Sequence, residues 1–427
     1  MSRASPTAAP GQPGDAPRRR LSAVTRPIDD PPILGELLPG LSGDDFAWLT
    51  TRGGFVAQGV ATEIPVGGAD GFLNTVEVDD PLGMWATGVI ACGALPFAGG
   101  DDAVLRVPAS VIGHTEGTWW HTTIGASGRH HTPDPRVTSP YIDTAQRRPE
   151  VRGISSSPDR DGWRGMVHAA LTQIRRGELA KVVLAREVAV TLVDAPLPGD
   201  ILRQLVDDAA GAFVFAAQGF VGASPELLVR REGGNVSSQP MAGSVAVSTD
   251  DATTSERLDT LTRSGKDRDE HRVVVEAVAD ALEAYTTELD VPTSPDLVRL
   301  PSVAHLATRV TGVLDDDAPS ALGLARALHP TPAVGGTPRD RAVALIDVLE
   351  PFDRGPYAGP VGWVNARGDG EWAVALRCGS VEGRTVRLYA GAGIVSGSDP
   401  DREWDETEAK LRPMLTALGI QPREPRP

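Results

Sequence analysis

The chain has 427 residues, of which 41% are hydrophobic and 23% charged, a composition typical of a globular enzyme. Its formal net charge is −16 at pH 7 and no basic block offsets it, which argues against nucleic acid or an anionic membrane as the main partner. Cys92 and Cys378 stand far apart in apolar stretches, which argues against a disulfide framework or a zinc site and favours a cytoplasmic protein.

The first part of the chain carries few chemical signals. Residues 1–28 are rich in Pro, Ala, Gly and Arg and lack the apolar centre of a signal peptide, so we expect a disordered tail. Residues 29–155 alternate short β-like runs with Gly and Pro turns, and their histidines have no third ligand at metal spacing. The longest apolar run here, GMWATGVIACGALPFAG, is too short to span a bilayer.

Longer elements begin near residue 160, and residues 156–420 are predicted to form the catalytic region. GWRGMVHAALTQIRRGEL predicts an amphipathic helix, and KVVLAREVAVTL predicts a strand. We then expect a helix over about 198–209, strands at FVFAAQ and ELLVRREG, a long helix over KDRDEHRVVVEAVADALEAYTTEL, and a hairpin over EWAVALRCGSVEG and RTVRLYAGAG. Helices and strands interleave without βαβ regularity, which favours one large layered α+β domain. Residues 421–427 are expected to be a short tail.

The long helix places acids on an unusual face. Asp267 and Glu270 share a helical stripe with Val274 and Val278, so Glu270 should point toward the core. Acids in a first turn also favour the positive end of the helix dipole. That alternative explains their position along the helix but not their face.

A second acidic helix follows a glycine-rich turn. In EWDETEAKL, Glu403, Glu406 and Lys410 share one face, which is either a solvated surface with an ordinary i,i+4 pair or part of a site. Asp399 or Ser398 would cap this helix. Carboxylates from two such helices, with water completing the coordination, are suited to hold Mg²⁺.

Three other polar residues occur in apolar contexts. Arg377, inside the apolar strand EWAVALRCGSV, suits either a carboxylate ligand or a structural ion pair. Lys181 stands at the head of an apolar strand, where burial would favour a neutral amine that can act as a base. Glu226 follows Pro225 at a strand start, where partial burial would raise its pKa and let it act as an acid.

Eight stretches occur in a fixed order between residues 160 and 418: KVVLAR, GASPELLVR, QPMAGSVAVS, SGKDRDEH, HPTPAVGGTP, EPFDRGPYAGPVGW, ALRCGSV and AGAGIVSGSDPDREWDETEAKL. In this order they resemble the chorismate-utilising enzymes, and most closely the isochorismate synthases among them. The resemblance implies the fold of anthranilate synthase component I, with extended antiparallel sheets and helices outside. It also implies a Mg²⁺-dependent isomerisation of chorismate, in which water adds at C2 and the C4 hydroxyl leaves.

The same resemblance implies a role for each matching residue. Lys181 is implied as the general base and Glu226 as the general acid. Glu270 and Glu406 are implied as direct Mg²⁺ ligands, with Asp267 and Glu403 supporting the ion through its waters. The positions implied to bind the substrate carboxylates or to line the pocket are Gly243, Ser244, His305, Ala333, Arg377, Gly391, Gly393 and Lys410.

Two residues distinguish members of the family. Relatives that use ammonia do not carry the lysine found at Lys181, so its presence favours water as the nucleophile. Salicylate synthases, which go on to expel pyruvate, tend to carry Thr at the position of Ala333, so this alanine favours stopping at isochorismate. A salicylate synthase and a non-catalytic chorismate-binding protein remain the alternatives. We expect a monomer or weak dimer whose product feeds siderophore, salicylate or menaquinone synthesis.

Overall fold

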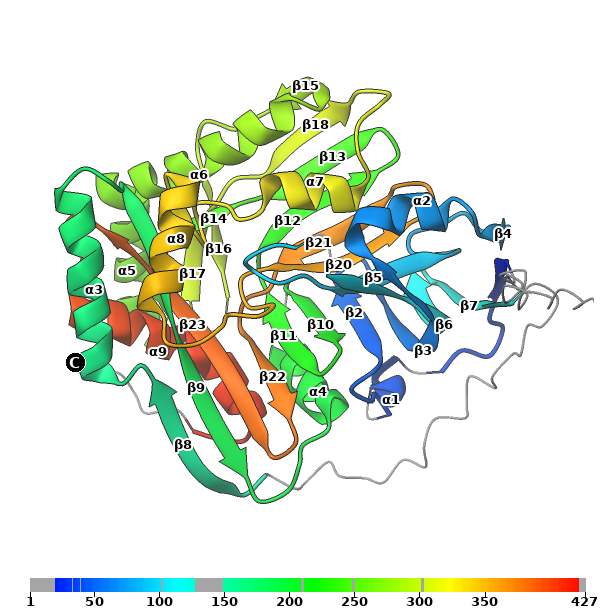
Figure 1. Ribbon diagram of the computed structural model, residues 1–427, viewed down its shortest axis with the longest axis horizontal. Helices are drawn as coiled ribbons and strands as arrows, with labels where there is room; N and C mark the ends of the chain where they lie inside the picture. The colour runs from blue at the N-terminus through cyan, green and yellow to red at the C-terminus, as the bar shows by residue number, and fades with distance from the viewer. Residues whose placement is uncertain are drawn as a thin grey trace, which may run out of the picture.

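The computed structural model describes residues 20–421, except residues 33, 39, 101–102, 127–148, 209–210, 248–249 and 301–302. Its helices lie outside extended antiparallel sheets (Figure 1). The helices are α1 (Leu34–Leu37), α2 (Ala69–Leu73), α3 (Arg160–Arg175), α4 (Pro198–Asp208), α5 (Asp251–Arg263), α6 (Gly265–Glu283), α7 (Ala321–Leu328), α8 (Arg339–Leu349) and α9 (Pro400–Ala417), with a 3₁₀ turn η1 (Val66–Gly68).

The strands of the first half are β1 (Leu21–Pro27), β2 (Phe46–Thr50), β3 (Gly53–Pro65), β4 (Glu77–Asp79), β5 (Ile90–Ala94), β6 (Val104–Thr115), β7 (Thr118–Ala126), β8 (Val151–Ser157), β9 (Lys181–Leu192), β10 (Phe213–Ala217) and β11 (Phe220–Ser224). Those of the second half are β12 (Leu227–Glu232), β13 (Asn235–Gln239), β14 (Met241–Ala246), β15 (Thr286–Asp290), β16 (Asp296–Arg299), β17 (Val303–Ala307), β18 (Val310–Leu314), β19 (Gly336–Thr337), β20 (Pro360–Asn365), β21 (Gly370–Val374), β22 (Cys378–Glu382) and β23 (Thr385–Val395).

Hydrogen bonds join most strands into one continuous sheet, while β14, β16 and β17 form a small separate sheet. From β8 the pairings run through β9, β23, β22, β11, β10, β2, β3 and β6. They continue from β6 through β5, β20, β21, β12, β13, β18 and β15. All these pairs are antiparallel, and β1–β4 is a parallel pair. Strands of both halves of the chain therefore belong to one sheet.

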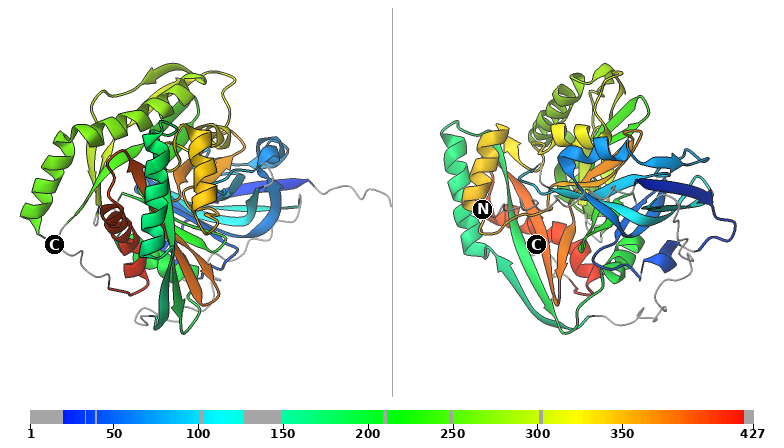
Figure 2. Two further views of the ribbon diagram at one scale, coloured as in Figure 1. Left: turned by 60° about the vertical axis from the view of Figure 1, so that its left-hand side comes forward. Right: turned by 45° about the vertical axis from the view of Figure 1, so that its right-hand side comes forward.

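The main hydrophobic core fills the space between the N-terminal strands and β20 and β21. Phe55 of β3 packs edge-on against Trp363 of β20 at 6.0 Å between ring centroids, and Trp48 and Trp372 are fully buried in the same cluster. A second core lies beneath α4 and α9, where Leu411 and Met414 join the side chains of β9, β10, β11 and β23. In Figures 1 and 2 the N-terminal strands lie on the side of the molecule opposite α3 and α9.

The structure confirms the expected layered α+β fold, and the strand predicted at KVVLAREVAVTL coincides with β9. The helix predicted over residues 162–179 is α3, which ends earlier, at Arg175, and the helix predicted over about 198–209 is α4. Asp399, one of the two predicted caps, is the N-cap of α9, and its side chain accepts hydrogen bonds from the amides of Asp401 and Arg402.

Three details of the sequence prediction are wrong. Residues 21–27, expected within a disordered tail, form β1, because this segment pairs with β7 and buries Ala23. The end of the predicted long helix, TTEL, belongs instead to β15, because this segment pairs with β18. Arg377 lies between β21 and β22 and not inside a strand. Residues 1–19 and 422–427, which hold the rest of the predicted tails, lie outside the described residues.

Within the described residues, no helix combines the length and the apolar character needed to cross a membrane.

A buried carboxylate ties the two halves of the sheet together and provides a test of the fold. Glu371 of β21 accepts a hydrogen bond from Trp48 Nε1 of β2 at 2.9 Å and from Arg230 Nε of β12. Glu371→Ala should lower the free energy of unfolding by about 3–5 kcal/mol, because Arg230 loses its partner in a largely buried position. Chemical denaturation measures this change. The control Glu382→Ala removes a half-exposed partner of Arg387 and should stay within about 0.5 kcal/mol; equal losses would contradict the assignment.

Candidate active site

All fourteen positions singled out in the sequence line one cavity. Its walls come from β9, β14, β17, β23, α6 and α9 and from the segments around Glu226, Ala333 and Arg377. Among the described residues, none before Lys181 lines it. The positions are Lys181, Glu226, Gly243, Ser244, Asp267, Glu270, His305, Ala333, Arg377, Gly391, Gly393, Glu403, Glu406 and Lys410.

An ion pair joins β9 to α6 across the cavity. Lys181 is the first residue of β9, and its Nζ lies 2.8 Å from Glu270 Oε1 in the second turn of α6. The two side chains are 7% and 19% exposed, so the pair is mostly shielded from water. The prediction that Glu270 points inward is therefore confirmed, and the partner of its carboxylate is Lys181.

A second ion pair lies on α9. Lys410 Nζ contacts Glu406 Oε1 at 2.6 Å and also donates to the carbonyl oxygen of Gly391 at 2.9 Å. That carbonyl is accessible because β22 pairs with β23 only as far as Tyr389. Glu406 and Lys410 thus form the i,i+4 pair that was expected for a solvated helix surface. The pair nevertheless faces the cavity.

The carboxyl groups of the cavity differ in their environments. Burial raises the pKa of Glu226 to about 7, although the amide of Met241 and the charges of Arg377 and Lys181 oppose it. Burial and then repulsion from Glu406 raise the pKa of Glu403 to about 7 as well. Protonated carboxyl groups are consequently available at these two positions near neutral pH.

Glu270 behaves in the opposite way. Burial alone would raise its pKa, but the charge and hydrogen bond of Lys181, aided by Lys410 and Lys266, outweigh that effect and lower it. Glu270 is therefore an anion at neutral pH.

The buried Arg377 contacts a histidine. Arg377 Nη2 lies 2.9 Å from His305 Nε2. Burial, and then the positive charges of Arg377 and Lys410, lower the pKa of His305 well below its usual value, so the ring is neutral and its Nε2 accepts from the guanidinium. Arg377 has φ +47°, an uncommon backbone conformation for a residue with a side chain. A residue held in this way retains donors for an anion.

Three glycines keep the cavity open. A Cβ on Gly393 would lie 2.9 Å from Lys181 Cε and 3.2 Å from Glu270 Oε1, and one on Gly391 would lie 2.9 Å from Tyr357 Oη. Gly243 has φ +75° at an irregularity in the β14–β17 register, beside Ser244. Side chains at Gly393, Gly391 and Gly243 would fill cavity space beside Lys181 and Glu270, beside Tyr357, and beside Asp267, respectively.

The carboxylates of α6 and α9 can serve as cation ligands. Among the described residues, no group of three or more His, Cys, Asp or Glu side chains stands ready to hold an ion. Mg²⁺, however, is usually held by one or two carboxylates together with water and ligand oxygens. Glu270 and Glu406 supply one carboxylate each, and the repulsion between Glu403 and Glu406 is of the kind that a cation relieves. The donor set therefore fits Mg²⁺.

The comparisons with known proteins agree with this geometry. The family described as "Chorismate binding enzyme" matches residues 135–419. This chain belongs to the chorismate-binding enzymes. Isochorismate synthase DhbC of Bacillus subtilis is 43% identical over 278 residues, which is 62% of this chain and 70% of that protein. Isochorismate synthase EntC of Escherichia coli is 41% identical over 268 residues, 62% of this chain and 68% of that protein.

A solved structure shares the architecture of this chorismate-binding enzyme. It is MenF, the menaquinone-specific isochorismate synthase from Escherichia coli, with a TM-score of 0.79 and 26% identity over 93% of this chain and 94% of that one. The similarity includes the N-terminal strands, which lie outside the stretches between residues 160 and 418 that carry the sequence resemblance.

Sequence reasoning missed several residues that line the cavity. Lys266, Tyr357, Leu376 and Tyr389 all do so. Tyr357 and Tyr389 stack at 5.3 Å between ring centroids, and burial raises the pKa of Tyr389 to about 12. Lys266 and Tyr357 stand inside the quoted stretches SGKDRDEH and EPFDRGPYAGPVGW, which are the signals that could have indicated them.

The raised pKa of Glu226 predicts a pH-dependent stability. Its pKa rises from 4.5 to about 7 on folding, so the folded chain holds the proton more tightly than the unfolded chain. The free energy of unfolding therefore falls as pH rises from about 4.5 to about 7. Relative to Glu226→Gln, the unaltered chain should lose about 2–3 kcal/mol between pH 5 and pH 8, measured by chemical denaturation. Glu382→Gln is the control, and parallel pH curves for the unaltered chain and Glu226→Gln would refute the prediction.

Proposed function

We propose that this chorismate-binding enzyme is an isochorismate synthase, which isomerises chorismate to isochorismate. The observation that carries the proposal is one cavity lined by a lysine, a buried protonated carboxyl group and a buried arginine: Lys181, Glu226 and Arg377. The family match and the names of the relatives support the same activity.

The two reacting groups have complementary roles in this proposal. Lys181 removes a proton from the water whose oxygen forms the new bond to C2 of the ring. Glu226 gives a proton to the C4 hydroxyl, which leaves as water while the ring double bonds shift, so the reaction is a net isomerisation. Lys181 Nζ is hydrogen-bonded to Glu270 Oε1 in this structure, so the proposed role requires Lys181 to separate from Glu270. The raised pKa of Glu226 supports its role as the proton donor near neutral pH.

The remaining charges suit a substrate with two carboxylates. Arg377 offers its buried guanidinium to the enolpyruvyl carboxylate beside the backbone of Gly391 and Gly393. Mg²⁺, when bound by Glu270 and Glu406, would supply the positive charge that the ring carboxylate needs. Gly243 and Ser244 would seat that carboxylate, with Asp267 and Glu403 supporting the ion through water. Ala333, His305 and Lys410 complete the proposed pocket.

Product analysis tests this proposal. The purified chain is incubated with chorismate and Mg²⁺, with and without a chelator, and the products are separated by chromatography and identified by mass. We expect isochorismate in a mixture with chorismate, and we expect the chelator to abolish it. Salicylate and pyruvate would instead identify a salicylate synthase and overturn the interpretation of Ala333. Absence of any product together with chorismate binding would favour the non-catalytic alternative.

The role of Lys181 has its own test. Lys181→Ala should lower the rate of isochorismate formation by roughly 10²–10⁴-fold, the usual contribution of general acid–base catalysis, while equilibrium dialysis still detects chorismate binding. Lys266→Ala is the matched control, because it removes a lysine from the same cavity without a proposed proton transfer. Equal losses in the two variants would remove Lys181 from the role of base.

A further inference from the structure

The strand that carries Lys181 also carries a buried arginine on its other face. Arg186 is five residues further along β9, and because side chains alternate along a strand it points away from the side of Lys181. It is 1% exposed and lies against the second and third turns of α9. Its position gives β9 a direct link to the helix that bears Glu403, Glu406 and Lys410.

Most contacts of Arg186 are made with α9. Its Nε donates to Thr407 Oγ1 at 2.7 Å, its Nη2 donates to Glu408, and its guanidinium carbon lies 3.9 Å from the centre of the Trp404 ring. Its Nη1 donates to Ser156 Oγ of β8 at 3.1 Å. Residues of two successive turns of α9 therefore hold the guanidinium of Arg186: Trp404 stacks on it, and Thr407 and Glu408 accept its hydrogen bonds.

The contact face and the cavity face of α9 are distinct. Trp404, Thr407 and Glu408 form the first, and Glu403, Glu406 and Lys410 form the second. At about 100° per residue the two sets are centred about 120° apart around the helix axis. A rotation of α9 that broke the contacts of Arg186 would thus also turn the carboxylates and the lysine away from the cavity.

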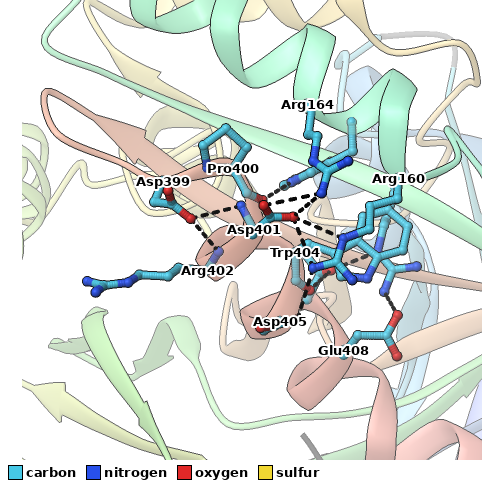
Figure 3. A network of polar contacts seen from close by, with 12 residues as sticks. Arg160, Arg164, Asp399, Pro400, Asp401, Arg402, Trp404, Asp405 and Glu408 are labelled. Atoms are coloured by element: carbon cyan, nitrogen blue, oxygen red, sulfur yellow. Dashed lines mark hydrogen bonds and ion pairs between the residues drawn. The ribbon is translucent and has the colours of Figure 1, made fainter. Parts of the chain in front are cut away.

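Other contacts hold the two ends of α9: Leu411 and Met414 pack into the second core, and polar contacts hold its start. Asp401 accepts hydrogen bonds from Arg160 and Arg164 of α3 (Figure 3). Trp163 Nε1 donates to the carbonyl of Pro400 at 3.0 Å. The side chains of Arg160, Arg164 and Asp401 are all 42–47% exposed, so water competes for these bonds. Arg186 is buried, and its contacts on α9 lie between Glu403 and Lys410 in the sequence.

We propose that Arg186 is a positioning residue: it fixes the rotation of α9 against β9 and so sets where Glu403, Glu406 and Lys410 stand relative to Lys181. The inference rests on the proposed function, because it assigns Glu406 to the cation. Residues that orient metal ligands commonly contribute to metal affinity when they do not touch the metal themselves.

The test measures cation binding without turnover. Mn²⁺ serves as the probe for the Mg²⁺ site, and the free ion is counted by electron paramagnetic resonance in the absence of chorismate. Arg186→Met, which keeps the length but removes the charge and the donors, should weaken Mn²⁺ binding by about 10–100-fold. Arg186→Lys, which keeps the charge, should recover part of that affinity. If Arg186→Met does not fold, Glu408→Gln replaces it in this test, because it removes the negative charge of a half-exposed partner of Arg186.

Two controls separate positioning from general stability. Leu105→Ala opens a cavity in the core beside β6, and Arg387→Met removes the two ion pairs that Arg387 of β23 makes with Glu187 and Glu382. Leu105→Ala should lower the melting temperature, and both variants should bind Mn²⁺ within about twofold of the unaltered chain. Hydrogen exchange of peptides over residues 400–412 should accelerate in Arg186→Met and not in either control.

The outcomes distinguish this inference from the proposed function. Failure of the unaltered chain to bind Mn²⁺ would refute the proposed cation site, while the exchange experiment would still report whether Arg186 orders α9. Unchanged exchange over residues 400–412 in Arg186→Met would overturn the inference. So would an equal loss of Mn²⁺ affinity in Leu105→Ala.

Discussion

The ion pair between Lys181 and Glu270 is the interaction on which the arrangement of the cavity depends. The chain has a net charge of −16, which disfavours a substrate with two carboxylates. Such a substrate therefore needs positively charged side chains gathered in one cavity. Here the start of β9 and the second turn of α6 bring Lys181 Nζ and Glu270 Oε1 to 2.8 Å, in a position mostly shielded from solvent. Lys410 and Glu406 repeat the arrangement on α9. The cavity thus holds charges of both signs: each of these two lysines is paired with a glutamate, whereas the buried Arg377 contacts the neutral His305.

The same pairing divides the carboxyl groups into two kinds. Glu270, beside Lys181, has a lowered pKa and is an anion suited to a cation. Glu226, buried without such a close lysine, has a pKa raised to about 7 and is suited to give up a proton. The pKa values of two glutamates of one cavity are therefore shifted in opposite directions by their surroundings, a division that acid–base enzymes use in general.

Much of this could be read from the sequence, because the decisive residues stand inside continuous stretches. The strand KVVLAREVAVTL and the inward face of Glu270 follow from local patterns of apolar residues. The lysine partner of Glu270 could not be predicted, since it lies 89 positions away and only the folded chain brings it near. The apolar neighbours of Arg377 predicted a strand, whereas its φ of +47° is incompatible with a strand and it lies between β21 and β22. The segment of β1 looked like a tail because its pairing partner, β7, is far along the chain.

The motif-poor N-terminal strands have a structural reason to be present. They line no part of the cavity within the described chain, yet β2 pairs with β10 and β5 pairs with β20. Through those strands they support the segments that carry Glu226 and Arg377, because the carbonyl of Glu226 accepts from the amide of Val374 at 3.1 Å and the carbonyl of Arg377 accepts from the amide of Ala223 at 3.1 Å. The acid and the arginine are each held by backbone bonds between neighbouring strands of one sheet. A sheet that includes the N-terminal half therefore fixes both groups more rigidly than loops alone would, which is what a site with paired charges requires.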